Sequence, residues 1–202
     1  MNSEHERLLR YGKPAADWNE ALPLGNGTLG AMVFGRTGQE LIQLNEDSLW
    51  YGGPRDRHNP DASRFLPQIR ELVFAGRARE AERLAALALT GLPETQRHYL
   101  PLGDLLLTFP EVPDEEAEAY VRELDLSTAI ASAAYRAAGV GCHREMFVSF
   151  PDQVLAVRLT ADVPGALSVT ARLGRAKWRY VEHIAKHGND TLIMRDGGAG
   201  EG

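Results

Sequence analysis

Six residues whose side chains are suited to binding a sugar lie close together near the start of this 202-residue chain. They are Trp18, Asn26, Asn45, Glu46, Trp50 and Tyr51. Trp and Tyr rings can stack on the apolar face of a sugar, while amides and carboxylates bind its hydroxyl groups. We therefore take Asn45, Glu46 and Trp50 as candidate substrate-binding residues. The alternative is structural: the tryptophans anchor a core or an interface, and Asn45 and Glu46 bond to loop backbone.

A glycine-rich run at residues 25–30 matches the G-x-G-x-x-G pattern of dinucleotide-binding loops. That chemistry needs a strand before the glycines and a helix after them, so that the helix N-terminus meets the pyrophosphate. Pro23 interrupts the approach, and residues 31–35 are typical of a strand rather than a helix. The run therefore predicts a tight turn that leads into a strand.

The metal-binding patterns in the sequence are incomplete. His183 and His187 have the i, i+4 spacing of a helical metal site, but Glu182 precedes the pair, so the H-E-x-x-H motif is absent. Cys142 is the only cysteine, which excludes an internal disulfide and argues against structural zinc. We expect neither a metal nor another cofactor.

Carboxylates are plentiful, but the sequence does not pair them. The candidates are Glu46, Asp47, Asp104, Glu111, Asp125, Glu145 and Asp152. Glycoside hydrolysis needs two carboxyl groups facing each other across a pocket, about 5 Å or about 6.5–9.5 Å apart. The G-x-S-x-G motif of serine hydrolases is also absent. No catalytic residue can be assigned from these residues.

Composition limits the classes of partner. The formal net charge is −6, with 22 Lys and Arg against 28 Asp and Glu, which argues against nucleic-acid binding. No apolar run approaches the ~18 residues of a membrane span. The first residues are polar and lack the apolar core of a signal peptide, so we expect a cytoplasmic location.

Short apolar runs, and further along the chain alternating apolar and polar residues, predict a series of strands. Residues 29–34 and 41–44 form a predicted hairpin that turns at 36–38. From about residue 103 the period is two, in the stretches 105–109, 130–137, 143–150, 155–159 and 167–173. Strands in series without helices between them favour an antiparallel β-sandwich over a parallel α/β fold.

Residues 60–92 change to a helical period and predict a helical hairpin inserted into the sandwich. The apolar positions are Leu66, Ile69, Leu72 and Val73, then Ala81, Leu84, Ala85 and Ala88. Gly76 ends the first predicted helix, and Pro67 is expected in or just before its first turn. Gly91 and Pro93 end the second.

The predicted fold is thus mainly β, and we expect residues 1–202 to form a single sandwich domain. A glycine-rich stretch, residues 196–202, follows the short predicted strand 192–194, and no closing strand comes after it. We therefore expect the sandwich to be incomplete within this chain.

Several segments of the sequence are similar to one known family. Residues 18–35, WNEALPLGNGTLGAMVFG, and 44–54, LNEDSLWYGGP, resemble the N-terminal domain of glycoside hydrolase family 95. The likeness continues through residues 99–104, 120–129 and 144–152 and covers roughly residues 10–175. This family contains α-L-fucosidases, with some members acting on other sugars.

The resemblance implies a β-sandwich that precedes an (α/α)₆ barrel. In the family the barrel hydrolyses terminal α-L-fucosyl linkages with inversion, using a Glu as general acid and an Asn/Asp pair that activates water. None of those motifs occurs here, so no catalytic residue transfers to this chain. The implied function is a non-catalytic domain that supports the barrel and borders the site for a fucosylated oligosaccharide. A stand-alone carbohydrate-binding module is the alternative, and a nucleotide-binding protein, based on residues 25–30, is a third hypothesis.

Overall fold

The computed structural model describes residues 7–52, 55–110, 112, 117–175 and 181–196. These residues form two compact units. The sandwich unit lies within Met1–Leu49 and Leu100–Gly198, and the helical unit lies within Trp50–Tyr99.

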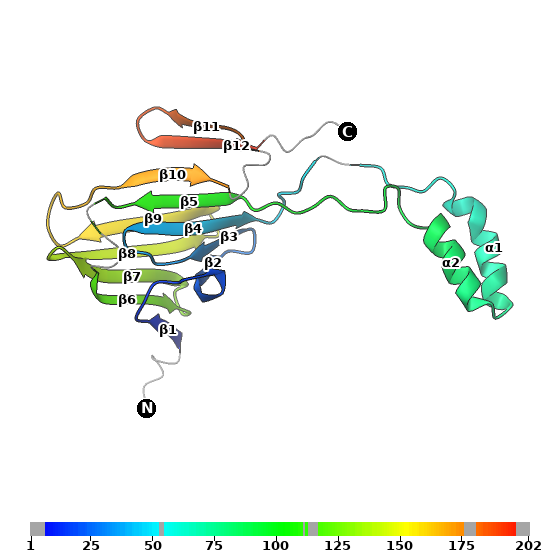
Figure 1. Ribbon diagram of the computed structural model, residues 1–202, viewed down its shortest axis with the longest axis horizontal. Helices are drawn as coiled ribbons and strands as arrows, with labels where there is room; N and C mark the ends of the chain where they lie inside the picture. The colour runs from blue at the N-terminus through cyan, green and yellow to red at the C-terminus, as the bar shows by residue number, and fades with distance from the viewer. Residues whose placement is uncertain (1–6, 53–54, 111, 113–116, 176–180, 197–202) are drawn as a thin grey trace. The chain divides into compact units, whose positions relative to one another are not determined.

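Two five-stranded antiparallel sheets make up most of the sandwich unit (Figure 1). Sheet A contains β1 (Leu8–Tyr11), β6 (Glu118–Asp125), β7 (Ile130–Ala137), β8 (Val140–Ser149) and β9 (Val154–Ala161), in the order β1-β6-β7-β8-β9. Sheet B contains β2 (Leu22–Gly25), β3 (Leu29–Val33), β4 (Gln39–Glu46), β5 (Gly103–Thr108) and β10 (Thr170–Gly174), in the order β10-β5-β4-β3-β2. A separate hairpin pairs β11 (Val181–His187) with β12 (Thr191–Asp196). The predicted mainly β, antiparallel sandwich is confirmed.

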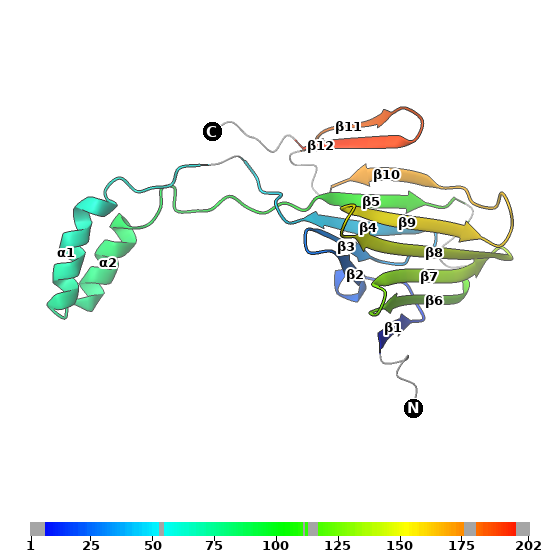
Figure 2. The ribbon, with the colours of Figure 1, turned by 180° about the vertical axis from the view of Figure 1, so that it is seen from behind.

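The core lies between the two sheets. Figure 2 shows the strands of these sheets from behind. The buried residues of the core come from both sheets: Leu22, Leu24, Ala31, Val33, Ile42, Leu107 and Phe109 from sheet B and the residue after β5, and Leu124, Ala131 and Met146 from sheet A. Along β4 the buried Glu40 and Ile42 alternate with less buried neighbours. Burial of these apolar side chains is what holds the sheets together, at roughly 25 cal/mol per Å² of apolar surface.

The predicted hairpin at 29–44 is confirmed, since β3 pairs with β4 and Val33 lies opposite Ile42. The predicted strand 167–173 begins only at Thr170. Thr170 lies opposite Thr108, where the partner β5 ends, so the residues before it have no strand to pair with.

The glycine-rich run forms the turn between β2 and β3, with Gly25 opposite Gly30. Asn26 Oδ1 accepts hydrogen bonds from the backbone N–H groups of Thr28 and Leu29, at 3.0 and 2.8 Å. Pro23 lies within β2 and pairs with Met32, so the expectation that it interrupts the approach to the glycines is wrong. A strand also follows the glycines, so the expected turn is confirmed and the helix that a pyrophosphate site needs is missing from this place.

A short 3₁₀ helix, η2 (Trp18–Glu20), covers part of the outer face of sheet B. Ala15 and Ala21 pack there against Phe34, and the Ala15 N–H donates to the Phe34 carbonyl at 2.8 Å. Arg122 of β6, almost fully buried, holds the same segment, because its Nε and Nη1 donate to the carbonyls of Lys13 and Glu20 at 2.8 and 2.7 Å. This anchoring fixes the position of Trp18.

A second buried arginine, Arg144 of β8, crosses from sheet A toward sheet B. Its Nη1 donates to the Arg36 carbonyl at 2.5 Å and its Nη2 to the Thr37 carbonyl at 2.6 Å. Nη2 also donates to the Tyr135 hydroxyl, and the guanidinium lies 3.9 Å from the Phe109 ring centroid. Burial raises the pKa of Tyr135 to about 12.

The helical unit contains α1 (Ala62–Phe74) and α2 (Ala78–Ala88), which confirms the predicted helical hairpin. Ile69, Ala81 and Ala88 are buried. Gly76, at φ +72°, makes the turn after α1, as predicted. Pro67 is the sixth residue of α1, so its expected place in or before the first turn is wrong; the helix begins earlier than its apolar period indicates.

Neither of the two helices in the described part of the chain is long and apolar enough to cross a membrane. His183 and His187 lie on strand β11 and not on a helix, so their spacing does not form the helical metal site considered above. Across the described residues, no group of three or more His, Cys, Asp or Glu side chains is arranged to hold a metal ion.

Candidate functional site

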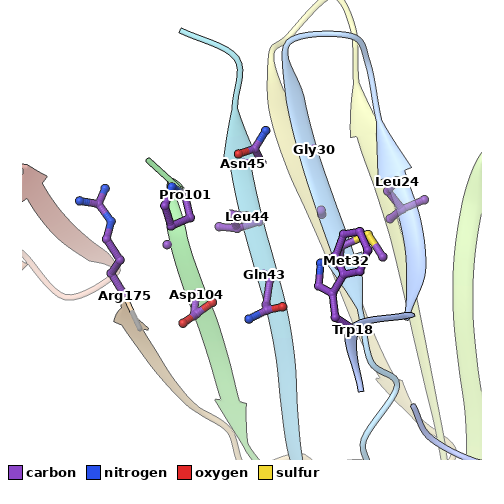
Figure 3. Close-up of a pocket in the computed structure, with 12 residues that line it drawn as sticks. Trp18, Leu24, Gly30, Met32, Gln43, Leu44, Asn45, Pro101, Asp104 and Arg175 are labelled. Atoms are coloured by element: carbon purple, nitrogen blue, oxygen red, sulfur yellow. The ribbon is translucent and has the colours of Figure 1, made fainter. Parts of the chain in front are cut away.

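A groove of about 360 Å³ lies on the outer face of sheet B (Figure 3). That volume falls in the range of about 300–1,000 Å³ that is typical of small-molecule sites. Its principal side chains are Trp18, Met32, Gln43, Asn45, Asp104 and Arg175. The groove therefore combines an aromatic ring with amide, carboxylate and guanidinium groups.

Strand register brings the polar groups into one row. Gln43 of β4 lies opposite Met32 of β3 on one side and Asp104 of β5 on the other. Asn45 lies two residues further along β4 and therefore on the same face of the sheet. Gly30 lies opposite Asn45, and because it has no side chain it leaves the floor of the groove open there.

The two ends of the row are formed by residues outside the strands. Trp18 of η2 is 56% exposed, although its segment is anchored by Arg122. Arg175 follows β10, is 5% exposed, and its Nη2 donates to the Leu102 carbonyl at 3.0 Å. A partly exposed ring on an anchored turn can present a flat apolar surface to a ligand without first being ordered.

The three candidate substrate-binding residues lie in different surroundings. Asn45 is exposed and lines the groove. Glu46 accepts hydrogen bonds from the Ser48 N–H and hydroxyl, at 3.1 and 2.8 Å to Oε2, so it orders the loop after β4. Trp50 belongs to the helical unit, is 49% exposed, and packs edge-to-face against Tyr99 with ring centroids 5.3 Å apart.

The other aromatic and amide residues near the N-terminus also separate. Asn26 Nδ2 donates to the Ser149 carbonyl at 2.8 Å and to Gln153 Oε1 at 3.1 Å, which makes it a structural tie. Tyr51 of the helical unit stacks on His98 with ring centroids 5.0 Å apart. Of the six residues, Trp18 and Asn45 line the groove on sheet B.

Sequence reasoning missed Met32, Gln43 and Arg175. The alternation of β4 carries a signal for Gln43, because it has the same parity as Asn45 and must share its face. Arg175 has no such signal, since it lies beyond the end of β10 and reaches the groove only because β10 pairs with β5.

The side chains that line the groove are of the types that bind a sugar. Asp104 is the one carboxylate among the lining residues that the structure describes. Hydrolysis of a glycosidic bond by the usual mechanisms requires a second carboxyl group at a set distance. The ring of Trp18 with the amides of Gln43 and Asn45 fits the apolar and hydroxyl faces of a neutral sugar.

The comparisons with known proteins agree on the class of domain. Residues 9–197 match the family described as glycosyl hydrolase family 65, N-terminal domain. The match covers most of the chain, and this protein belongs to that family of glycoside hydrolase N-terminal domains.

Similar curated proteins carry α-fucosidase names. The chain is 40% identical over 161 residues to Alpha-L-fucosidase 2 of Arabidopsis thaliana, covering 79% of this chain and 19% of that protein. It is 34% identical over 180 residues to Probable alpha-fucosidase A of Aspergillus niger, covering 86% of this chain and 22% of that protein. The chain thus spans about a fifth of the length of these relatives.

Proposed function

We propose that this chain is the non-catalytic N-terminal domain of a family 95 α-L-fucosidase. The observation that carries the proposal is the 40% identity to Alpha-L-fucosidase 2 over most of this chain but only a fifth of that protein. In the complete enzyme, a catalytic barrel elsewhere in the polypeptide would hydrolyse terminal α-L-fucosyl linkages with inversion. The domain described here would support that barrel and contribute the groove on sheet B to glycan binding.

The contents of the groove support a binding role. Asp104 alone cannot serve as both the acid and the base of an inverting glycosidase. Trp18 offers a ring to the apolar face of the 6-deoxy sugar, and Gln43 and Asn45 offer amides to its hydroxyl groups. We accordingly expect the 202-residue chain to release no nitrophenol from 4-nitrophenyl α-L-fucoside, and measurable release would contradict a non-catalytic domain.

The size of the protein in its source cells tests whether the domain is part of a larger enzyme. An immunoblot with an antibody raised against this chain should detect a band several times heavier than 22.2 kDa. A band near 22.2 kDa would instead favour a stand-alone carbohydrate-binding module, for which the exposed Trp18 in an open groove is the supporting observation.

The groove itself is tested by titrating L-fucose into the isotopically labelled chain and following the amide signals of Gln43 and Asn45. Trp18→Ala should weaken binding about tenfold, since aromatic contacts are worth ~1.4 kcal/mol or more. The control is Phe74→Ala, which removes an exposed aromatic ring from the end of α1, outside the groove, and should leave the fucose titration unchanged. Loss of binding in both variants, or in neither, would argue against a fucose site on sheet B.

A further inference from the structure

A second pocket, of about 340 Å³, lies entirely within the helical unit. The segment that leads into α1 and the segment that follows α2 are joined there by backbone hydrogen bonds. The Tyr51 N–H donates to the His98 carbonyl and the Leu92 N–H to the Arg57 carbonyl, both at 3.0 Å. The lining residues are Trp50, Tyr51, Gly52, Arg55, Arg57, Thr95, Gln96 and Arg97.

Three arginines make this pocket strongly positive in a chain of net charge −6. In the described part of the chain, no ion pair joins Arg55, Arg57 or Arg97 to a carboxylate. Arg57 is fixed by the backbone, because its Nε and Nη2 donate to the carbonyls of Pro93 and Glu94 at 3.0 and 2.6 Å.

The acidic residue between two of these arginines has its own partner. Asp56 accepts hydrogen bonds from the backbone N–H and from Nδ1 of His58, at 2.9 and 2.6 Å. Among the described residues, Asp56 therefore forms its ion pair with His58 and none with Arg55 or Arg57.

Arg97 carries the most specific evidence for a ligand. Its Nη1 is buried and has no hydrogen-bond partner among the described residues. Buried polar nitrogens are nearly always bonded, and an unsatisfied charged donor costs more than a neutral one. An oxyanion is the acceptor that a guanidinium binds best, because its two oxygens match the planar N–H fork.

Gly52 leaves room for the Arg97 guanidinium. It has a φ of +75°, and a Cβ placed there would overlap the Arg97 guanidinium and lie 3.0 Å from its Cδ. The guanidinium thus lies directly over a backbone position that only glycine can occupy without displacing it. A side chain at position 52 would therefore move the guanidinium away from its present place.

The aromatic residues of the pocket suit a sugar ring. Trp50 is half exposed and oriented by its edge-to-face contact with Tyr99, while Tyr51 is held against His98. Thr95 and Gln96 add a hydroxyl and an amide that can bind ring hydroxyl groups.

We propose that this pocket binds the carboxylate of an acidic sugar, a hexuronic acid residue of a glycan. The carboxylate would lie against Arg97 with Arg55 beside it, and the sugar ring would lie against Trp50. This inference goes beyond the fucosidase proposal and does not depend on the groove on sheet B.

An NMR titration of the isotopically labelled chain tests the inference with D-glucuronate, D-glucose and acetate as probes. D-glucuronate should shift the signals of Gly52 and the Trp50 indole N–H in a saturable way. D-glucose, which has the same ring without the carboxylate, should bind at least about tenfold more weakly, as should acetate, which has no ring. Added salt should weaken the D-glucuronate response, because the contact is between charges.

Arg97→Gln should weaken D-glucuronate binding at least about tenfold, and Gly52→Ala should do the same by displacing the guanidinium. Arg79→Gln is the control, since it removes an exposed arginine from α2 outside the pocket and should leave binding unchanged. The comparison of D-glucuronate with D-glucose uses the unaltered chain, so it stands even where a variant fails to fold.

Equal responses to D-glucuronate and D-glucose, no saturable shift at Gly52, or equal effects of Arg97→Gln and Arg79→Gln would each overturn the inference. Its failure is distinguishable from failure of the fucosidase proposal. The two titrations report at different residues, Gly52 and Trp50 here against Gln43 and Asn45 on sheet B.

Discussion

Glu40 and Arg144 form an ion pair between the two sheets of the sandwich, with Glu40 Oε2 3.2 Å from Arg144 Nη1. Their side chains are 0% and 2% exposed. The Gly35 N–H donates to Glu40 Oε1 at 2.8 Å, so the carboxylate also holds the turn between β3 and β4. A buried pair of this kind is a weak source of stability, but loss of one partner leaves the other charge uncompensated.

The stability of the sandwich should depend on pH through Glu40. Burial raises the pKa of this carboxyl from 4.5 to about 7, although Arg144 and the Gly35 N–H act in the opposite direction. Between these two pH values the folded chain keeps a proton that the unfolded chain has lost. The free energy of unfolding should therefore fall as pH rises from about 4.5 to about 7, by at most on the order of 3 kcal/mol.

Urea unfolding of the wild type and of Glu40→Gln across that pH range measures this contribution. The amide cannot titrate, so the variant should lack the part of the pH dependence that belongs to Glu40. Tyr120 and Tyr135, which also lie near this pair, stay protonated throughout the range because burial raises the pKa of both. Identical pH profiles for the two proteins would contradict the assignment.

Replacing Arg144 should be severely destabilising. Arg144→Met removes the donors to the Arg36 and Thr37 carbonyls and leaves Glu40 buried without its cation, at a cost of about 3–5 kcal/mol. Arg158→Met is the matched control on the neighbouring strand. Its side chain is 74% exposed and its Nη1 lies 3.5 Å from Glu145, so its loss should cost less than about 1 kcal/mol in the same urea experiment.

Gly35 should tolerate no side chain. It has a φ of +72°, and a Cβ there would lie 2.5 Å from the Tyr120 hydroxyl oxygen, whose proton is donated to the Gly35 carbonyl. Gly139, at φ +80°, has open space for 4 Å around the place where a Cβ would lie, so it serves as a control for the backbone conformation alone. Thermal unfolding should show a Tm for Gly35→Ala well below that of Gly139→Ala, which should lose about 1–2 kcal/mol. Equal losses would mean that the close contact relaxes at no cost.

Asn26 and Asn45 should differ in their contribution to the stability of the sandwich. Asn26→Ala removes the acceptor for the Thr28 and Leu29 N–H groups and the donor to Ser149, so it should destabilise the sandwich by about 1–3 kcal/mol. Asn45→Ala removes an exposed side chain and should change stability by no more than about 0.5 kcal/mol. Urea unfolding measures the difference, and a large loss of stability in Asn45→Ala would indicate a structural role for that side chain.

Local patterns predicted most of the elements. Strand-length apolar runs and a period of two predicted seven strands of the two sheets, and a helical period predicted α1 and α2, because each pattern depends on neighbours within one turn or one pleat. Three strands, β1, β2 and β6, were not predicted. The predicted place of Pro67 in the helix and the predicted start of strand 167–173 were both wrong, and the reason is related. The end of an element depends on whether a partner strand or a packing surface continues, and that information lies elsewhere in the chain.

The sequence by itself determined that this protein is a β-sandwich domain with a helical hairpin and that aromatic and amide residues gather near its N-terminus. Tertiary structure decided which of them meet. Gln43 faces Asp104 because β4 pairs with β5, and Trp18 reaches the same groove because Arg122 holds its segment in place. Tertiary structure also decided that Arg144 is buried. The residues around it in the sequence do not indicate that Glu40 on the opposite sheet is its partner. Such contacts join residues distant in sequence, and the register of strand pairing and the packing of the sheets, rather than any local periodicity, bring them within bonding distance.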